Sequence, residues 1–141
     1  MTAQAREKIY INGIEEQMAA EPLEPFLKKN QHLRFEPPHT ACWRGYFGTW
    51  KLENDRLYLI DFNGNLEGID GESVPMELKD LFPSQKKVFA NWFTGIIKIE
   101  QGDLLEYVHM GYASKYERDL FLIFEDGVKV DEYTIDNTSG A

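Results

Sequence analysis

Short runs of alternating apolar and polar residues, separated by turn dipeptides, occupy most of the chain. Near the N-terminus, Lys8–Ile11 is followed by Asn12-Gly13 and then by Ile14–Met18. An Asn-Gly pair between two such runs favours a two-residue turn whose twist matches that of the paired strands. The pattern therefore predicts a β-hairpin in this segment.

Three more hairpins are predicted on the same grounds. The first joins residues 50–53 to residues 56–62 through Asn54-Asp55 and ends at Asn63-Gly64, with Leu57 and Leu59 on one face. The second joins residues 96–100 to residues 104–110 through Gln101-Gly102, and the third joins residues 116–125 to residues 128–135 through Asp126-Gly127. Strands joined by tight turns are antiparallel, so a series of sequential hairpins is expected.

Two segments have helical rather than alternating patterns. Pro22–Asn30 has two prolines near its start and basic residues before its final Asn, which is typical of a helix of one or two turns. In residues 83–92, Ser84 is a suitable N-cap, and Val88, Phe89 and Trp92 fall on one helical face. The chain is therefore expected to contain one or two short helices.

Together these elements predict an α+β fold that is mainly β. The expected architecture is an antiparallel curled sheet or partly closed β-barrel of up to eight strands, with one or two short helices. Because 141 residues are typical of one domain, residues 1–136 are expected to form a single β-rich domain. Residues 137–141 are small and polar, and they are expected to form a flexible tail.

The composition indicates a folded but acidic domain. The chain has 24 acidic and 15 basic residues, a net charge of −9, together with nine Phe, seven Tyr and three Trp. Disordered acidic chains are poor in aromatic residues, so this aromatic content indicates a packed core. The negative charge argues against nucleic-acid binding, which needs clustered Lys and Arg, and against docking on an anionic membrane.

The charge is distributed unevenly along the chain. It is −6 over residues 53–80 and −7 over residues 99–141, but +1 over residues 1–52 and +3 over residues 81–98. One interpretation is that exposed carboxylates keep the protein soluble and protect its edge strands. The other is an acidic face that attracts a basic protein partner.

Features of secreted, membrane-spanning and metal-binding proteins are not found in the sequence. The first nine residues include Gln4, Arg6, Glu7 and Lys8 and contain no apolar run typical of a signal peptide. The longest apolar run, Leu120–Phe124, is far shorter than the roughly 18 residues of a spanning helix. Cys42 is the only cysteine, so an internal disulfide or a cysteine zinc site is not expected. The three histidines have no ligand-like spacing, and no metal or cofactor is expected. These features predict a cytoplasmic protein.

Side chains suited to ligand binding gather in two segments. The predicted binding residues are Trp43, Arg44, Tyr46 and Trp50 in the first segment, and Tyr107, His109 and Tyr112 in the second. Arg44 could hold a phosphate or carboxylate between aromatic walls, or it could pair with a carboxylate at the edge of the core. Aromatic-rich strands mostly belong to a core, and a histidine at a sheet rim is often structural.

Catalysis is a less favoured interpretation of the same segments. A thiolate at Cys42 would need His39 or His109 as its base, with Asp119 or Glu106 to orient the imidazole. Nothing in the spacing enforces that geometry, and a lone cysteine that opens a strand is most often a small buried thiol. No catalytic residue is therefore predicted, and the protein is expected to be a binder rather than an enzyme.

Four stretches resemble those of a family of small bacterial proteins of uncharacterised function. They are Thr40–Tyr46, with the sequence T-A-C-W-R-G-Y, Leu81–Pro83, Phe89–Gly95 and Tyr107–Tyr112. The similarity extends from about residue 8 to about residue 130. It implies a bacterial, stand-alone cytoplasmic domain, and it supplies no functional residues to transfer.

The favoured function is a non-enzymatic acidic binding protein, and its concrete form is an immunity-like stoichiometric inhibitor of a basic protein. One alternative is a small-molecule-binding domain or small enzyme with an aromatic pocket around Arg44 and His109. Another is an interaction subunit that self-associates through exposed aromatic residues. These hypotheses require different surfaces: contiguous carboxylates, a shared cavity, or exposed aromatic side chains.

Overall fold

The chain folds into nine strands and two short helices over the residues that the computed structural model describes, which are 6–30, 35, 46–67, 73–106, 112 and 115–138. In chain order the elements are β1 (Glu7–Ile11), β2 (Ile14–Met18), α1 (Glu24–Lys29), β3 (Tyr46–Glu53), β4 (Arg56–Glu67), β5 (Ser73–Glu77), α2 (Leu78–Leu81), β6 (Val88–Phe89), β7 (Gly95–Glu106), β8 (Lys115–Glu125) and β9 (Val128–Asp136). The predicted α+β, mainly β fold is confirmed.

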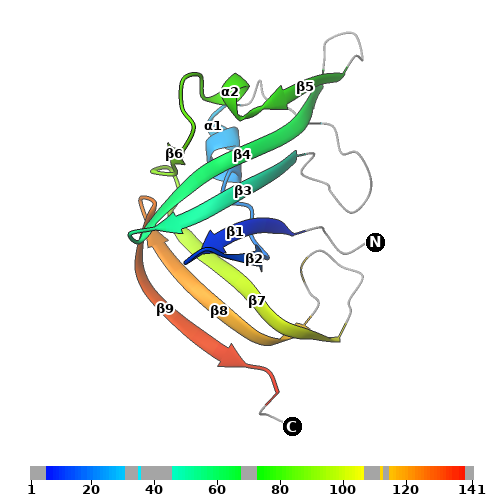
Figure 1. The fold of residues 1–141 in the computed structure, drawn as a ribbon, viewed down its shortest axis with the longest axis vertical. Helices are drawn as coiled ribbons and strands as arrows, with labels where there is room; N and C mark the ends of the chain where they lie inside the picture. Colours follow the sequence, from blue (N-terminus) through cyan, green and yellow to red (C-terminus); the bar gives the residue numbers. More distant parts are fainter. Residues whose placement is uncertain are drawn as a thin grey trace.

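Seven of the strands form a closed barrel. Their order is β3-β1-β2-β7-β8-β9-β4, and β4 returns to pair with β3. Figure 1 shows β4 and β9 converging where their hairpin turns lie side by side, and diverging away from that point. β5 and β6 pair with β4 outside the ring. β1 is parallel to β3, so the barrel is not purely a series of sequential hairpins.

Three of the predicted hairpins are confirmed, and their turns explain their sequences. Asn12-Gly13 joins β1 to β2, Asn54-Asp55 joins β3 to β4, and Asp126-Gly127 joins β8 to β9. In each turn both central residues have positive φ, between 50° and 83°. Primed two-residue turns need this conformation, which Asn, Asp and Gly adopt most easily.

Two predicted turns are wrong, because the dipeptides lie inside long strands. Asn63-Gly64 continues β4, where it pairs with both β3 and β5. Gln101-Gly102 lies at an irregularity in the pairing of β7 with β8, so it forms a bulge and not a reversal. Gly102 has a φ of 82°, and a Cβ there would lie 2.7 Å from the Cβ of Glu117.

The helix predicted over residues 83–92 is also wrong. Ser84 has a φ of 68° and lies in a turn, and Val88–Phe89 forms the short strand β6 beside β4. The helix α2 lies earlier, where Glu77 and Asp80 form a reciprocal capping box. The edge of β4 decides the conformation, because it offers backbone partners to β6 and to the N–H of Ala90, which donates to Leu57 at 2.8 Å.

The core lies inside the barrel, and α1 contributes to it. Alternate strand residues point inward, so Leu57 and Leu59 are buried while Tyr58 and Ile60 are half-buried, as the alternation predicts. Leu27 of α1, and Leu23 immediately before it, pack into the same interior. Figure 1 shows this helix behind β4.

The barrel closes through backbone hydrogen bonds between two hairpin turns. The N–H of Leu57 donates to the carbonyl of Gly127 at 2.9 Å, and the N–H of Lys129 donates to the carbonyl of Asp55 at 2.6 Å. Gly127 also donates to the carbonyl of Phe93 at 2.8 Å. β4 and β9 share a single residue pair, Arg56 with Val128. We call this meeting of turns the closure.

The geometry of the closure predicts that a side chain at residue 127 destabilises the fold. Its φ is 83°, and a Cβ there would lie 2.5 Å from the carbonyl oxygen of Ala90, a backbone atom held by its own hydrogen bonds. Gly127→Ala is therefore expected to combine backbone strain with a steric clash and to lower the free energy of unfolding by about 3 kcal/mol. Urea denaturation measures this change.

Gly13→Ala is the matched control for Gly127→Ala. Gly13 also lies at the second position of a primed turn, with a φ of 77°, but nothing lies within 4 Å of its hypothetical Cβ. Its substitution should cost only the backbone strain, about 1 kcal/mol. Equal losses for the two variants would show that the closure tolerates a side chain.

Candidate functional site

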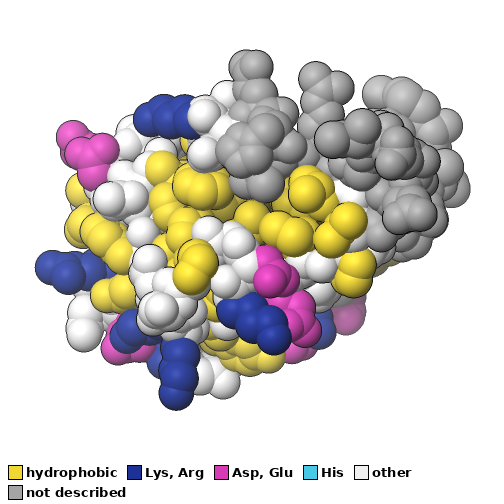
Figure 2. Space-filling model, turned by 90° about the horizontal axis from the view of Figure 1, so that it is seen from above, with side chains coloured by type: hydrophobic (Ala, Val, Ile, Leu, Met, Phe, Trp, Pro, Cys, Tyr) yellow, Lys and Arg dark blue, Asp and Glu magenta, His cyan; other side chains and the backbone are white. Residues whose placement is uncertain are grey.

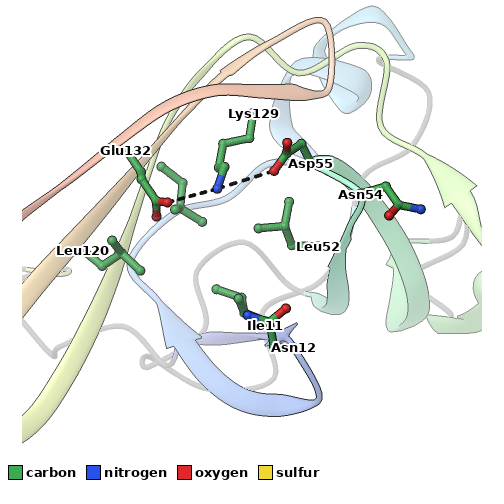
Figure 3. Close-up of a pocket in the computed structure, with 9 residues that line it drawn as sticks. Ile11, Asn12, Leu52, Asn54, Asp55, Leu120, Lys129 and Glu132 are labelled. Carbon is green, nitrogen blue, oxygen red and sulfur yellow. Dashed lines mark hydrogen bonds and ion pairs between the residues drawn. The ribbon is translucent and has the colours of Figure 1, made fainter.

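Three parts of the barrel enclose a cavity of about 400 Å³, which we call the mouth cavity. Its lining is Ile11, Asn12, Leu52, Asn54, Asp55, Leu120, Leu122, Lys129 and Glu132. Figure 3 shows that these residues come from the tip of the β1–β2 hairpin, from β3 and its turn, and from β8 and β9. Aliphatic side chains form the floor and polar side chains the rim, as is common in ligand sites at barrel mouths.

Lys129 lies at the rim between two carboxylates. Its Nζ is 3.5 Å from Asp55 Oδ1 and 3.2 Å from Glu132 Oε1 (Figure 3). The Lys129 side chain is 18% exposed, whereas those of Asp55 and Glu132 are 63% and 51% exposed. The ammonium is therefore held inward while both carboxylates reach solvent. These three charged groups leave the rim with a net charge of −1.

The second candidate feature is the hairpin of β8 and β9, residues 115–138, which we call the acidic hairpin. It has seven acidic and three basic residues, a net charge of −4. β9 is exposed over most of its length, and its large apolar side chains Val130, Tyr133 and Ile135 are 57%, 44% and 46% exposed. The acidic hairpin thus combines exposed carboxylates with exposed apolar groups.

Asp136 stays ionised at lower pH than an ordinary aspartate. The Thr138 hydroxyl and the Thr138 backbone N–H both donate to Asp136 Oδ1, at 2.6 and 2.8 Å. These bonds favour the carboxylate form and hold the pKa of Asp136 below its usual value. The negative charge at the C-terminal end of β9 therefore persists in mildly acidic solution.

Two predicted binding residues, Tyr46 and Trp50, lie in the barrel interior. They are 1% and 0% exposed. Trp50 Nε1 donates to Glu7 Oε1 at 3.1 Å, and the Tyr46 hydroxyl donates to Glu24 Oε1 at 2.9 Å. Burial, with the nearby negative charges of Glu7 and Glu24, raises the pKa of Tyr46 far above its usual value, so the phenol stays neutral. Both side chains contribute to the core around a buried carboxylate.

A third predicted residue, Tyr112, covers a buried ion pair. Arg6 Nε and Nη2 donate to the two oxygens of Glu100, at 2.6 and 3.0 Å. The guanidinium lies 5.3 Å from the ring centroid of Tyr112 and 5.9 Å from that of Tyr116. The side chain of Glu100 is fully buried and that of Arg6 is 10% exposed, so the pair is shielded from water.

An aromatic pocket is present among the described residues, but the residues that line it differ from the binding residues predicted from the sequence. The rings of Phe26, Phe82 and Trp92 have centroids 5.0 to 5.8 Å apart, and Phe82 and Trp92 are stacked. They line a cavity of about 410 Å³ together with Gln85, Val88, Phe89 and Asn91. Figure 2 shows, on the face seen from above, apolar side chains gathered among a mixture of Lys, Arg, Asp and Glu.

The other predicted site residues lie outside the described part of the chain. These are His39, Cys42, Trp43, Arg44, Tyr107 and His109. The predicted pocket around Arg44 and His109, and the alternative catalytic group with Cys42, therefore stay predictions. Asp119, considered as a partner for the imidazole, accepts a hydrogen bond at Oδ2 from Asn137 Nδ2 at 3.0 Å.

The mouth cavity was missed in the sequence because its residues carry turn signals. Asn12, Asn54 and Asp55 are explained locally by the positive φ of their turns. Lys129 and Glu132 are ordinary charged residues of a predicted strand. No local pattern indicates that two separate turns meet β8 and β9, although the acidic hairpin itself belongs to the −7 segment of the sequence.

Comparisons with protein-family models, with curated proteins and with solved structures find no match for the chain. The two helices in the described residues have six and four residues, and neither is long and apolar enough to cross a membrane.

The buried ion pair generates a double-mutant prediction. Arg6→Met leaves the carboxylate of Glu100 buried without its guanidinium partner, which is expected to lower the free energy of unfolding by about 3 kcal/mol. Arg6→Met combined with Glu100→Met removes both charges from the same buried place. The double variant should therefore be more stable than Arg6→Met alone.

Urea unfolding of the wild type, both single variants and the double variant gives the coupling energy of this pair. A coupling energy of about 2 kcal/mol is expected. Additive losses would show instead that Arg6 acts through packing on Tyr112 and Tyr116 and not through its charge.

Proposed function

We propose that this protein is a non-enzymatic binding domain that docks a basic protein partner on its acidic hairpin. The observation that carries the proposal is the exposure of β9, which presents Asp131, Glu132 and Asp136 beside Tyr133 and Ile135. Carboxylates on such a surface attract a positive partner and orient its approach, and the apolar side chains supply area that is buried on contact. This role needs a preformed surface and no catalytic group.

The position of the charge within the fold supports the proposal. Residues 115–138 form one continuous pair of strands, so their net charge of −4 is held on one element. Acidic residues lie close to lysines both elsewhere and within the hairpin: Glu53 lies between Lys51 and Lys87, Glu15 is 3.5 Å from Lys8, and Glu132 is 3.2 Å from Lys129. The acidic hairpin nevertheless keeps its excess of four negative charges. The acidic hairpin is therefore the surface best suited to a basic protein. Inhibition of that partner follows if the hairpin covers the partner's own binding or active site.

Charge neutralisation on β9 tests this proposal. The variant Asp131→Asn, Glu132→Gln, Asp136→Asn keeps the side-chain shapes and removes three charges. Its matched control is Glu15→Gln, Glu53→Gln, Asp61→Asn, which removes three charges from β2, β3 and β4. With a short poly-L-lysine peptide as the probe, isothermal titration calorimetry should show an affinity loss of about tenfold for the β9 variant and about twofold for the control.

Salt dependence provides the second readout for the same variants. The wild-type affinity should fall as the ionic strength rises, and the β9 variant should have the weaker dependence. Equal losses in the β9 variant and the control would contradict a dedicated acidic docking surface, because the attraction would then come from net charge alone.

The mouth cavity favours a second candidate function, the binding of a small amphipathic cation. Its floor of Ile11, Leu52, Leu120 and Leu122 suits an aliphatic chain. Its rim has a net charge of −1, which favours a positive head group over a negative one. A volume of about 400 Å³ lies within the range of small-molecule sites.

A matched pair of ligands tests the mouth cavity. Octylamine and octanoate have the same chain and opposite head-group charges, so we expect octylamine to bind about tenfold more tightly. Leu120→Trp should fill the cavity and abolish saturable octylamine binding. NMR chemical shifts of the residues that line the cavity measure this binding. Equal affinities for the two ligands, or unchanged octylamine binding by Leu120→Trp, would exclude this site.

A further inference from the structure

The outer edge of β9 is open over most of the strand. β9 pairs with β8 from Val128 to Asp136, but on its other side β4 pairs only with Val128. Beyond that point, residues 131–135 have no second strand partner within the described parts of the chain. Figure 1 shows β9 at the end of the row of strands, running away from β4. An open edge of this kind can template the addition of another strand.

The direction of the backbone groups on β9 follows from the hydrogen bond at its C-terminal end, because a register shift at Val130 interrupts the alternation that begins at Lys129. Successive strand residues direct their N–H and C=O groups to opposite edges. The N–H of Asn137 donates to the carbonyl of Glu117 on β8 at 2.8 Å, so Tyr133 and Ile135 also face β8. The intervening Thr134 therefore directs its N–H and C=O to the open edge. Thr134 is exposed and has no charge, which makes it suitable for a test of the backbone alone.

The two faces of β9 specify the chemistry of an added strand. Tyr133 lies on the outer face and stacks on Phe121 of β8, with ring centroids 4.9 Å apart and planes at 17°. Ile135 lies on the same face by alternation, while Glu132 and Asp136 alternate to the other face. A strand that alternates basic and apolar residues would place its cations beside the carboxylates and its apolar side chains beside Tyr133 and Ile135.

Pairing with a second copy of this chain is disfavoured by charge. An antiparallel pair of β9 strands centred on Thr134 would set Glu132 of each copy opposite Asp136 of the other. Like charges directly opposite each other destabilise a strand pair, and this contact would occur twice. The same carboxylates favour a basic strand. The net charge of −4 on each acidic hairpin also opposes pairing of two copies in other registers, so a heterologous basic segment is the favoured occupant.

We propose that the open edge of β9 binds an extended segment of its partner by strand addition, and that this segment alternates basic with apolar residues. This inference rests on the proposed function and adds how the partner is held. The backbone of the partner segment pairs with Thr134 and its neighbours, while its cations face Glu132 and Asp136. Backbone pairing supplies affinity, and the alternating side chains supply selectivity.

A proline substitution separates strand addition from simple charge attraction. Thr134→Pro removes the N–H that faces the open edge, retains every charge, and leaves the hydrogen bonds to β8 in place. Thr134→Val is the matched control, since it keeps the N–H and the β-branched shape. The probe is a blocked eight-residue peptide of alternating lysine and valine, with an alternating glutamate–valine peptide as the charge control.

Isothermal titration calorimetry should show that wild type and Thr134→Val bind the lysine–valine peptide equally and that Thr134→Pro binds at least about tenfold more weakly. The glutamate–valine peptide should not bind. Equal binding by Thr134→Pro and Thr134→Val would overturn strand addition. The proposed function would survive that result if Asp131→Asn, Glu132→Gln, Asp136→Asn still weakens binding, and it would fail if that variant binds like the wild type.

Amide hydrogen exchange gives a readout on the wild type that does not depend on the proline variant folding. The Thr134 N–H should exchange slowly only when the lysine–valine peptide is bound, whereas the Tyr133 N–H is protected by β8 in both states. Unchanged Thr134 exchange at saturating peptide would overturn the proposal. Analytical ultracentrifugation supplies a second test. A dimer that forms in the wild type and is absent in Thr134→Pro would also overturn the proposal, because it would assign the edge to a second copy.

Discussion

The closure between the β3–β4 and β8–β9 turns is the constraint on which the rest of this structure depends. The backbones of Leu57 and Lys129 donate across it to Gly127 and Asp55, and Gly127 also donates to Phe93. These few bonds join the two ends of a curled row of strands into a ring. They need residue 127 to lack a side chain, because the carbonyl of Ala90 occupies the space where a Cβ would lie.

Both candidate binding features follow from how narrow the closure is. Since β4 and β9 share only the pair Arg56–Val128, the two strands diverge beyond it. On the inside, the divergence leaves the mouth cavity, where Lys129 lies between Asp55 and Glu132. On the outside, it leaves β9 with an open edge. Glu132 contributes to both features, so the cavity rim and the acidic hairpin form adjoining parts of one negatively charged region.

The sequence predicts local reversals well where the turn itself needs a special backbone conformation. Asn12-Gly13, Asn54-Asp55 and Asp126-Gly127 all have positive φ and all reverse the chain. Gln101-Gly102 carries the same signal but forms a bulge, because β8 offers a continuous partner on the other side. The helix prediction for residues 83–92 is wrong for a similar reason. The spacing of their apolar residues fits a helix, but pairing with the edge of β4 and burial of Val88 favour a strand.

The sequence by itself determined the mainly β fold, three of the hairpins, α1 and the concentration of charge toward the C-terminal hairpin. These depend on turn conformation and on alternation, which are properties of neighbouring residues. Only the tertiary structure decided that β1 lies parallel to β3, that Trp50 and Tyr46 donate hydrogen bonds to Glu7 and Glu24 from the barrel interior, and that β9 keeps an open edge. Those outcomes depend on which strand edges meet across the barrel, and residues as far apart as Leu57 and Gly127 settle them through backbone groups that every residue type shares.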